Sequence, residues 1–314
     1  MKIVLYFTIF FLIILSNTLC SQNLILYDLE LFENNTKDSI AFISLSDNYI
    51  LSEHPDSLAI PNIEEKEEKD AQYLKLDSLY RKRFLSKMNI SETDSVFIYD
   101  YSTSILIPIP INNLNVVACL NIYGAEWPYK QSDFMIGFEI NRNFLKNSDK
   151  YFVNSLAYIG KKSPFVTGQL KPIIWKKIET KNFPLNRISP EETSKLQKYQ
   201  CEIGNAYAYN TDSLQYLIQE FVIKNDVLVR CLLVIRINTA KIVCERIYYD
   251  HESASPAPLN SNEPYSEINQ WTGKLFKNKP IVIFGFEYIS FGCPEITFLD
   301  PLEKDVYISC DNRH

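Results

Sequence analysis

The sequence predicts an α+β fold that consists mainly of antiparallel β-sheet. Two observations lead to this prediction. Short apolar runs bounded by turn residues recur along most of the chain, and only two segments combine helical spacing with capping residues. The 314 residues, 46% of them hydrophobic, are enough for one large or two ordinary domains with a substantial core.

One long helix is expected at about residues 63–88. Asn62 can cap its N-terminus, with Glu65 three residues further on, and its last turns are basic, which suits the helix dipole. The predicted apolar stripe, at helical spacing, consists of Tyr73, Leu76, Tyr80, Phe84 and Met88.

A second, short helix is expected at about residues 190–200. Ser189 precedes it as the cap, Pro190 takes its first position and Glu192 its third. Between the two helices, strands are expected at residues 96–101, 105–111, 114–123 and 134–140. Pro108 and Pro110 indicate an edge or irregular strand, since proline cannot donate to a neighbouring strand.

Residues 214–249 are expected to form three antiparallel strands. A three-residue turn at 224–226 would pair Phe221 with Val229 and keep the apolar faces aligned. Arg230 would lie on the opposite, partly solvated face. The next turn, around residues 238–241, would set Ile235 opposite Cys244. Cys231 would then lie too far along the strands to bond with Cys244.

The last part of the chain is expected to begin with a loop at residues 251–264. A long apolar strand at 281–291 and shorter strands at 296–299 and 306–309 follow. Cys293 and Cys310 lie at the ends of these elements, and we predict that they form a disulfide.

The first twenty residues read as a secretory signal peptide. Lys2 precedes a largely apolar run of thirteen residues, and a bilayer span needs about 20, so no membrane span is expected after cleavage. Residues 21–314 would be an exported β-rich globular region, periplasmic or secreted, forming either one continuous fold or two sub-domains that divide between 145 and 190. A lipoprotein acylated at Cys20 is the less favoured alternative, because Leu19 stands where such signals carry a small residue.

Charge and motif content exclude several functions. Loss of residues 1–20 removes Lys2 and no acidic residue, so the net charge of −6 becomes −7, which disfavours nucleic acid as a partner. His54, His251 and His314 lack the spacing of metal ligands, and no cofactor motif is present. We therefore expect no metal and no cofactor.

Three aromatic residues, Trp127, Tyr129 and Trp271, lie in or beside predicted loops and are the candidate binding residues. The favoured function is non-catalytic, namely recognition of an unknown protein or glycan, or a structural role, at the cell envelope. The alternative is a carboxylate-based hydrolase of envelope or extracellular polymers. It requires acidic side chains that converge in a cleft, for which the candidates are Glu126, Glu139 and Glu287.

Overall fold

A computed structural model describes most of the chain after the predicted leader. The described residues are 24–33, 39–49, 59–121, 123, 126–145, 152–198, 201–264 and 266–311. The predicted signal peptide with Cys20, and also His54 and His314, lie outside these ranges. None of the helices in the described ranges has the length and hydropathy needed to cross a bilayer.

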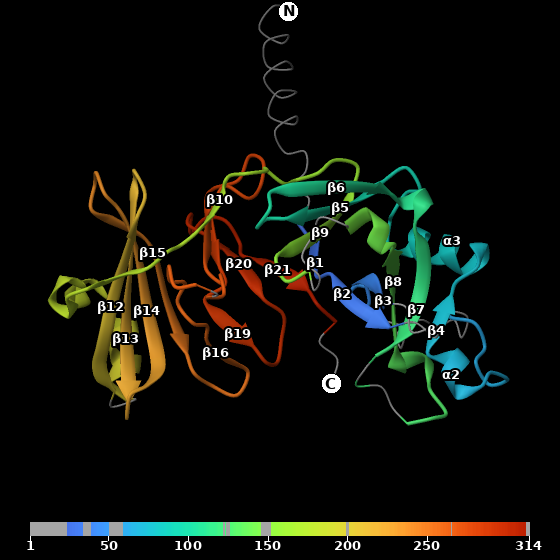
Figure 1. Cartoon of the computed structure of the whole chain (residues 1–314), viewed down its shortest axis with the longest axis horizontal. Helices are drawn as coiled ribbons and strands as arrows, with labels where there is room; N and C mark the ends of the chain where they lie inside the picture. The colour runs from blue at the N-terminus through green and yellow to red at the C-terminus, as the bar shows by residue number, and fades with distance from the viewer. Residues whose placement is uncertain are drawn as a thin grey trace, which may run out of the picture.

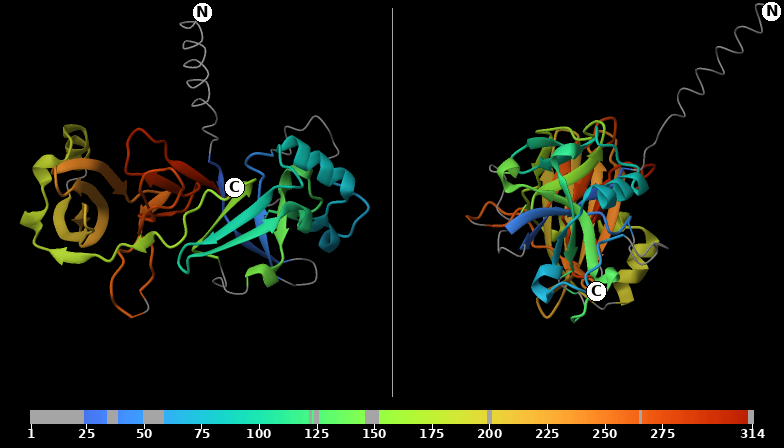
Figure 2. Two further views of the ribbon diagram at one scale, coloured as in Figure 1. Left: turned by 90° about the horizontal axis from the view of Figure 1, so that it is seen from above. Right: turned by 90° about the vertical axis from the view of Figure 1, so that its right-hand side faces the viewer.

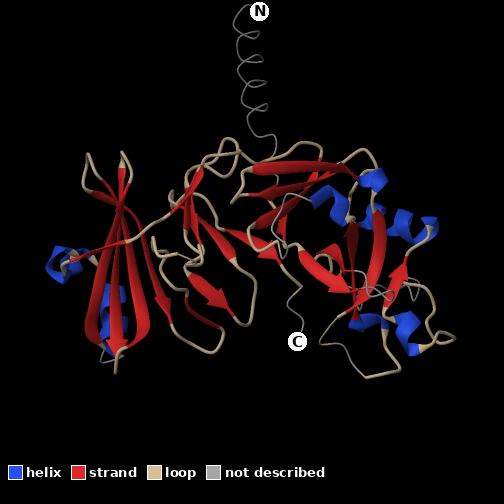
Figure 3. Ribbon diagram, viewed as in Figure 1, coloured by secondary structure: helices blue, strands red, loops and turns tan. Residues whose placement is uncertain are grey.

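Strands make up most of the described chain and the helices are short, which confirms the prediction of a β-rich fold (Figure 3). The strands form a nine-stranded sheet, two five-stranded sheets and a two-stranded sheet. Among the described residues, β1 and β21 pair in parallel and the other strand pairs are antiparallel. The sheets follow one another along the long axis of the molecule (Figure 1).

The first half of the chain lies at the right of Figure 1. Its strand β4 and helix α3 pack with neighbouring strands around one apolar core, in which Phe84 lies edge-on to Tyr49 and Phe138. The elements are β1 (Leu26–Tyr27), β2 (Glu30–Glu33), β3 (Ser39–Ser44), α2 (Glu68–Ala71), β4 (Tyr73–Lys75), α3 (Ser78–Lys87), β5 (Ser95–Asp100), β6 (Ile105–Pro110), β7 (Asn115–Leu120), β8 (Phe134–Ile140) and β9 (Ser155–Gly160).

The second half holds the longest strands, in the five-stranded sheet β11-β12-β13-β14-β15, which is strongly coiled when seen from above (Figure 2). Its elements are β10 (Leu170–Pro172), β11 (Lys176–Ile178), α4 (Pro190–Lys198), β12 (Glu202–Asn210), β13 (Leu214–Ile223), β14 (Asp226–Arg236), β15 (Lys241–Tyr249), β16 (Ala254–Pro256), β17 (Trp271–Gly273), β18 (Val282–Phe284), β19 (Glu287–Ile289), β20 (Glu295–Phe298) and β21 (Val306–Ser309). Helix α4 agrees with the predicted short helix, whose last two residues lie outside the described ranges.

The prediction of one long helix at 63–88 is wrong. Residues 73–75 form strand β4, which pairs with β7, and the ten-residue helix α3 starts only after Asp77. Asp77 is its cap, since its carboxylate accepts hydrogen bonds from the backbone N–H of Leu79 and Tyr80. Leu74 and Leu76 are both buried two positions apart, as in a strand, so pairing with β7 overrides the helical spacing of this segment.

The pairing of β13 with β14 follows the predicted register, with Phe221 opposite Val229. The turn itself differs, because only Lys224 and Asn225 form it, both with positive φ, and a bulge beside Phe221 restores the register. Cys244 lies opposite Val234 instead of Ile235, because Arg236 already pairs with Lys241 at the turn, and a bulge between Val234 and Ile235 shifts the register by only one residue.

Both faces of β14 are buried, which corrects the expectation that one face is partly solvated. Leu232 and Val234 pack against the C-terminal strands on one face, while Cys231 and Leu233 belong to a second core on the other. Arg230 lies among the buried residues and forms an ion pair with Glu220. Cys231 and Cys244 do not bond to each other, as predicted, and both are free cysteines.

The nine-stranded sheet, β10-β17-β18-β20-β21-β1-β9-β5-β6, contains strands from both halves of the chain. The two halves meet where β1 pairs with β21. The sheet is therefore continuous across the interval 145–190, and the division into two sub-domains stays a prediction. Strand β6, with Pro108 and Pro110, is at one end of this sheet, which agrees with its expected edge position.

The predicted disulfide between Cys293 and Cys310 is present, with 5.6 Å between the two Cα atoms. It joins the segment before β20 to the residue after β21. The predicted single strand at 281–291 is wrong, since the chain forms β18 and β19 with Gly285 between them. The predicted loop at 251–264 also contains a short strand, β16, which pairs with β19.

Gly285 interrupts the strand because its φ of +82° departs from extended backbone. Only glycine fits at this position, because a Cβ would lie 1.9 Å from the carbonyl oxygen of Asn269. Gly168 also has positive φ, +70°, but the nearest atom to a Cβ would be 4.0 Å away.

We expect Gly168→Ala to cost about 1 kcal/mol of unfolding free energy, and Gly285→Ala at least about 3 kcal/mol. Urea unfolding of the two variants measures this, and equal losses would contradict the account of Gly285.

Candidate functional site

The aromatic loop predicted as a binding site is partly accessible. Trp127 is 37% exposed, and its ring lies edge-on to that of Tyr129 at 5.1 Å. The Tyr129 hydroxyl donates to Glu68 and accepts from Gln72, with distances of 3.2 and 3.1 Å. Tyr129 therefore fastens the loop to the segment around α2, and Trp127 is the one of this pair that offers an open surface.

Trp271 has a different position from the one expected. It lies in strand β17, is 5% exposed, and packs edge-on against Tyr101 at 5.1 Å. Because Trp271 is buried, the structure does not support a direct contact between its side chain and a ligand. The structure also does not bring it to Trp127. Trp271 belongs to the apolar cluster that contains Phe276, whereas Trp127 contacts Tyr129, which packs against a different cluster.

A cleft of about 570 Å³ opens where the first strands of the chain meet the last ones. We call it the acidic cleft, because four carboxyl side chains line it, together with aromatic and amide side chains. The residues used below are Asp28, Glu30, Asn154, Asn269, Glu287, Tyr288 and Glu295.

Asp28 and Glu30 reach this position because the chain changes sheets between them. Strand β1 belongs to the nine-stranded sheet, whereas β2 belongs to the sheet with β3. Leu29 is buried at the crossing, and its N–H donates to the Asp28 carboxylate at 2.8 Å. The two carboxyl groups on either side of Leu29 are thereby left at the boundary between the sheets.

The opposite wall comes from the segments around β18, β19 and β20. Tyr288 is 42% exposed, and its hydroxyl donates to Glu267 at 2.8 Å, which fixes the direction of the ring. Glu295 starts β20, two residues after Cys293. The disulfide from Cys293 to Cys310 therefore ties this wall to the end of β21.

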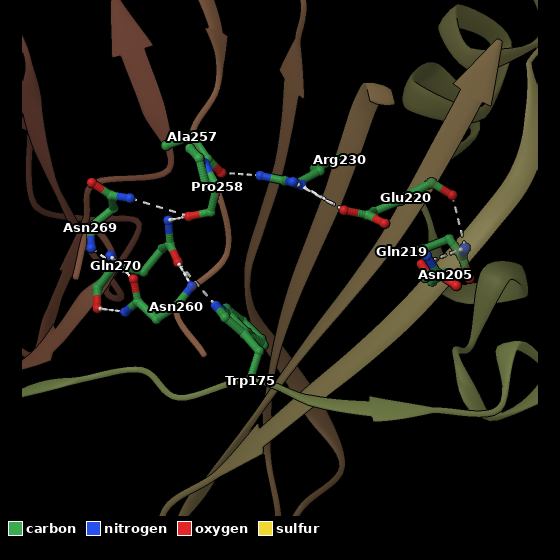
Figure 4. Close-up of polar contacts among 10 residues, drawn as sticks. All are labelled: Trp175, Asn205, Gln219, Glu220, Arg230, Ala257, Pro258, Asn260, Asn269 and Gln270. Carbon is green, nitrogen blue, oxygen red and sulfur yellow. Dashed lines mark hydrogen bonds and ion pairs between the residues drawn. The ribbon is translucent and has the colours of Figure 1, made fainter. Parts of the chain in front are cut away.

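A buried polar network holds the base of this wall (Figure 4). The Asn260 amide donates to the carbonyls of Ile173 and Gln270 at 2.8 and 2.7 Å, and its oxygen accepts from the N–H of Asn269 and Gln270. The Gln270 amide donates to Gly285 at 3.0 Å and accepts from the indole of Trp175 at 3.2 Å. The network thus fixes Asn269 and Gly285, both of which line the acidic cleft.

Burial raises the pKa of three carboxyl groups in the acidic cleft, those of Asp28, Glu30 and Glu287. It raises the pKa of Asp28, and for Glu30 burial together with repulsion from Asp28, Asp311 and Asp47 raises the pKa to about 7. The pKa of Glu287 is also raised, by burial first and by Glu295, against the lowering effect of His251. Near neutral pH the cleft can therefore present both protonated and ionised carboxyl groups.

Of the three glutamates proposed for a hydrolase, Glu287 alone lines the acidic cleft. Glu126 is exposed in the loop beside Trp127. Glu139 lies on β8, where it accepts hydrogen bonds from Tyr73 at 3.0 Å and Asn115 at 2.8 Å. The structure therefore does not bring the three glutamates together in one cleft.

The sequence reading missed Asp28 and Glu30, although one signal was available. Two acidic residues flank a leucine within a short alternating apolar segment, which indicates that both point away from the buried Leu29. The sequence does not reveal the change of sheet between β1 and β2, because that change depends on pairing with strands far along the chain.

Within the described ranges, no group of three or more His, Cys, Asp or Glu side chains is arranged to hold a metal ion.

The raised pKa of Glu30 predicts a pH-dependent stability. A folded-state pKa of about 7 against an ordinary value of 4.5 means that the folded protein binds this proton more tightly. The stabilisation is complete below about pH 4.5 and is lost as the pH rises through 7. We expect the unfolding free energy to fall by about 1–2 kcal/mol between pH 5 and 8, and by clearly less in Glu30→Gln.

Urea unfolding at a series of pH values measures this effect. The salt-bridged Glu92, whose pKa Arg81 lowers through a hydrogen bond, supplies the control. A lowered pKa gives stability that is present above pH 4.5 and is lost only at more acidic pH, so Glu92→Gln should leave the change between pH 5 and 8 intact. A Glu30→Gln variant with the full pH dependence would refute the assignment.

No protein-family model matches the chain, and neither a curated protein nor a solved structure shows significant similarity to it.

Proposed function

We propose that this protein is an exported, non-catalytic recognition protein of the cell envelope, and that it binds a glycan in the acidic cleft. The observation behind the proposal is the composition of a single cleft of about 570 Å³. It combines the accessible ring of Tyr288 with several hydrogen-bonding side chains. Ligand sites of this kind use apolar and aromatic surface for contact area and a few polar groups for orientation.

The polar groups of the cleft suit a ligand that is rich in hydroxyl groups. The carboxyl oxygens of Glu287 and Glu295 can accept hydrogen bonds, a protonated Glu30 can donate one, and the amides of Asn154 and Asn269 can do both. The Asn269 amide already donates to the Pro258 carbonyl at 3.3 Å, so its orientation is set before a ligand arrives.

The charge of the cleft selects among glycans. Four carboxyl groups line it, and Asp47 and Asp311 add negative charge near Glu30. Such a site disfavours phosphorylated or uronic-acid ligands and favours neutral or amine-bearing sugars. Export is supported by the leader pattern and by the Cys293–Cys310 disulfide, since disulfides persist mainly in oxidising compartments.

Binding to a panel of neutral, amino and acidic oligosaccharides, followed by calorimetry on the hits, tests the proposal. We expect Tyr288→Ala and Glu287→Gln each to weaken binding at least about tenfold, corresponding to about 1.4 kcal/mol. Phe144→Ala is the matched control, because the Phe144 ring is 44% exposed, close to the 42% of Tyr288, and does not line the cleft. Trp127→Ala tests the aromatic loop separately, and a loss of binding in that variant alone would move the site there.

A carboxylate-based hydrolase is the second candidate, and the raised pKa of Glu30 favours it. A carboxyl group with a pKa of about 7 can act as a general acid, provided that another carboxylate in the same cleft stays ionised. Glu287 and Glu295 are available for that role. Glu30 and Glu287 are therefore the candidates for acid–base chemistry, in place of the set Glu126, Glu139 and Glu287.

Release of reducing ends from envelope polysaccharides distinguishes the two functions. If the cleft is catalytic, Glu30→Gln and Glu287→Gln should each lower the rate at least about a hundredfold, while Glu139→Gln should leave it unchanged. Oligosaccharide binding without any turnover would support recognition alone, and turnover that survives both substitutions would exclude the cleft as the active site.

A further inference from the structure

A second cavity, of about 360 Å³, lies at the turn end of the β14–β15 hairpin. It is bounded by this hairpin, by Pro280 and Ile281 before β18, and by the segment 299–301 after β20. It is separate from the acidic cleft, with which it shares no lining residue. Its volume is near the lower limit of ligand pockets, which are about 300–1,000 Å³.

Two cations face each other across the hairpin at this cavity. Arg236 on β14 is paired directly with Lys241 on β15, and both side chains line the cavity. Like charges in directly opposed positions destabilise a pair of strands. Within the described part of the chain, neither forms an ion pair, and the chain as a whole carries a net charge of −6. The fold therefore keeps a local positive charge that it does not neutralise.

The surroundings of the pair strengthen this local charge. Arg187 donates to the carbonyl of Ala240 in the turn of the same hairpin, which brings a third cation to this end of the sheet. Asp300 is the one acidic residue among those lining the cavity, and its Oδ1 accepts from the N–H of Leu302 at 3.0 Å within its own turn. Asp300 lies beyond ion-pair distance from Arg236 and Lys241.

The remainder of the cavity is apolar. Leu214 lies next to Arg236 on the neighbouring strand, and Leu299 belongs to the core between the five-stranded sheet and the C-terminal strands. Ile281 is 37% exposed at the cavity. The cavity thus offers two cations at the hairpin and an apolar surface that leads from them toward a buried core.

We propose that this cavity binds a small amphiphilic anion. A carboxylate or phosphate group would lie between Arg236 and Lys241, and a short hydrocarbon chain would lie against Ile281 and Leu299. The head group removes the repulsion between the two cations, and the chain covers apolar surface that is otherwise open to water. This site is independent of glycan binding in the acidic cleft.

Calorimetry with octanoate and octyl phosphate on the full chain after leader removal tests the proposal. Inorganic phosphate and 1-octanol serve as probes of the head group and the chain alone. We expect both octyl anions to bind at least about tenfold more tightly than either partial probe. If inorganic phosphate binds as well as octyl phosphate, the apolar wall is not involved, and if no octyl anion binds, the proposal is overturned.

Substitutions of residues that line the cavity at the β14–β15 hairpin test whether the ligand binds there. The double variant Arg236→Gln/Lys241→Gln should weaken octyl phosphate at least tenfold, and Ile281→Trp should obstruct the chain with a similar loss. The control Lys176→Gln/Lys177→Gln removes the same charge from the exposed edge strand β11 of the same sheet, and should leave affinity unchanged. Equal losses in the two double variants would show a general effect of net charge and would refute the site. Circular dichroism confirms that each variant is folded.

Discussion

The buried polar network around Asn260, Gln270 and Arg230 is the constraint on which the second half of the molecule depends. Residues 257–264 and 266–270 are irregular and lie between the coiled five-stranded sheet and the C-terminal strands, so sheet pairing does not satisfy their backbone groups. The two amide side chains replace that pairing and bond to backbone on both sides. Arg230 completes the connection by donating to the Ala257 carbonyl (Figure 4).

Arg230 can take part because Glu220 compensates its charge. Both side chains are almost fully buried, and the guanidinium donates to the carboxylate at 3.0 and 3.1 Å. An isolated charge at this depth would cost several kcal/mol, so the pair has to be present as a unit. The cross-strand register that places Glu220 opposite Arg230 is therefore a precondition for the bond from Arg230 to Ala257.

Both candidate sites lie at the margins of this arrangement. The acidic cleft lies where the network positions Asn269 and Gly285 against the crossing between β1 and β2. The cavity at the β14–β15 hairpin lies at the end of the core that the five-stranded sheet shares with the C-terminal strands. In each place side chains from distant parts of the chain meet without filling the space, and charged groups line the opening.

The sequence by itself determined the β-rich class, the pairing of Phe221 with Val229, the edge position of the proline-rich β6 and the Cys293–Cys310 disulfide. These depend on local alternation, on turn residues or on the chemistry of one residue type. Tertiary structure alone decided that residues 73–75 form a strand, and that Asp28 and Glu30 line the same cleft as Glu287 and Glu295. The reason is physical: strand pairing and cleft walls join segments that are far apart in the sequence, and the free energy of those contacts exceeds the local preference of any single segment.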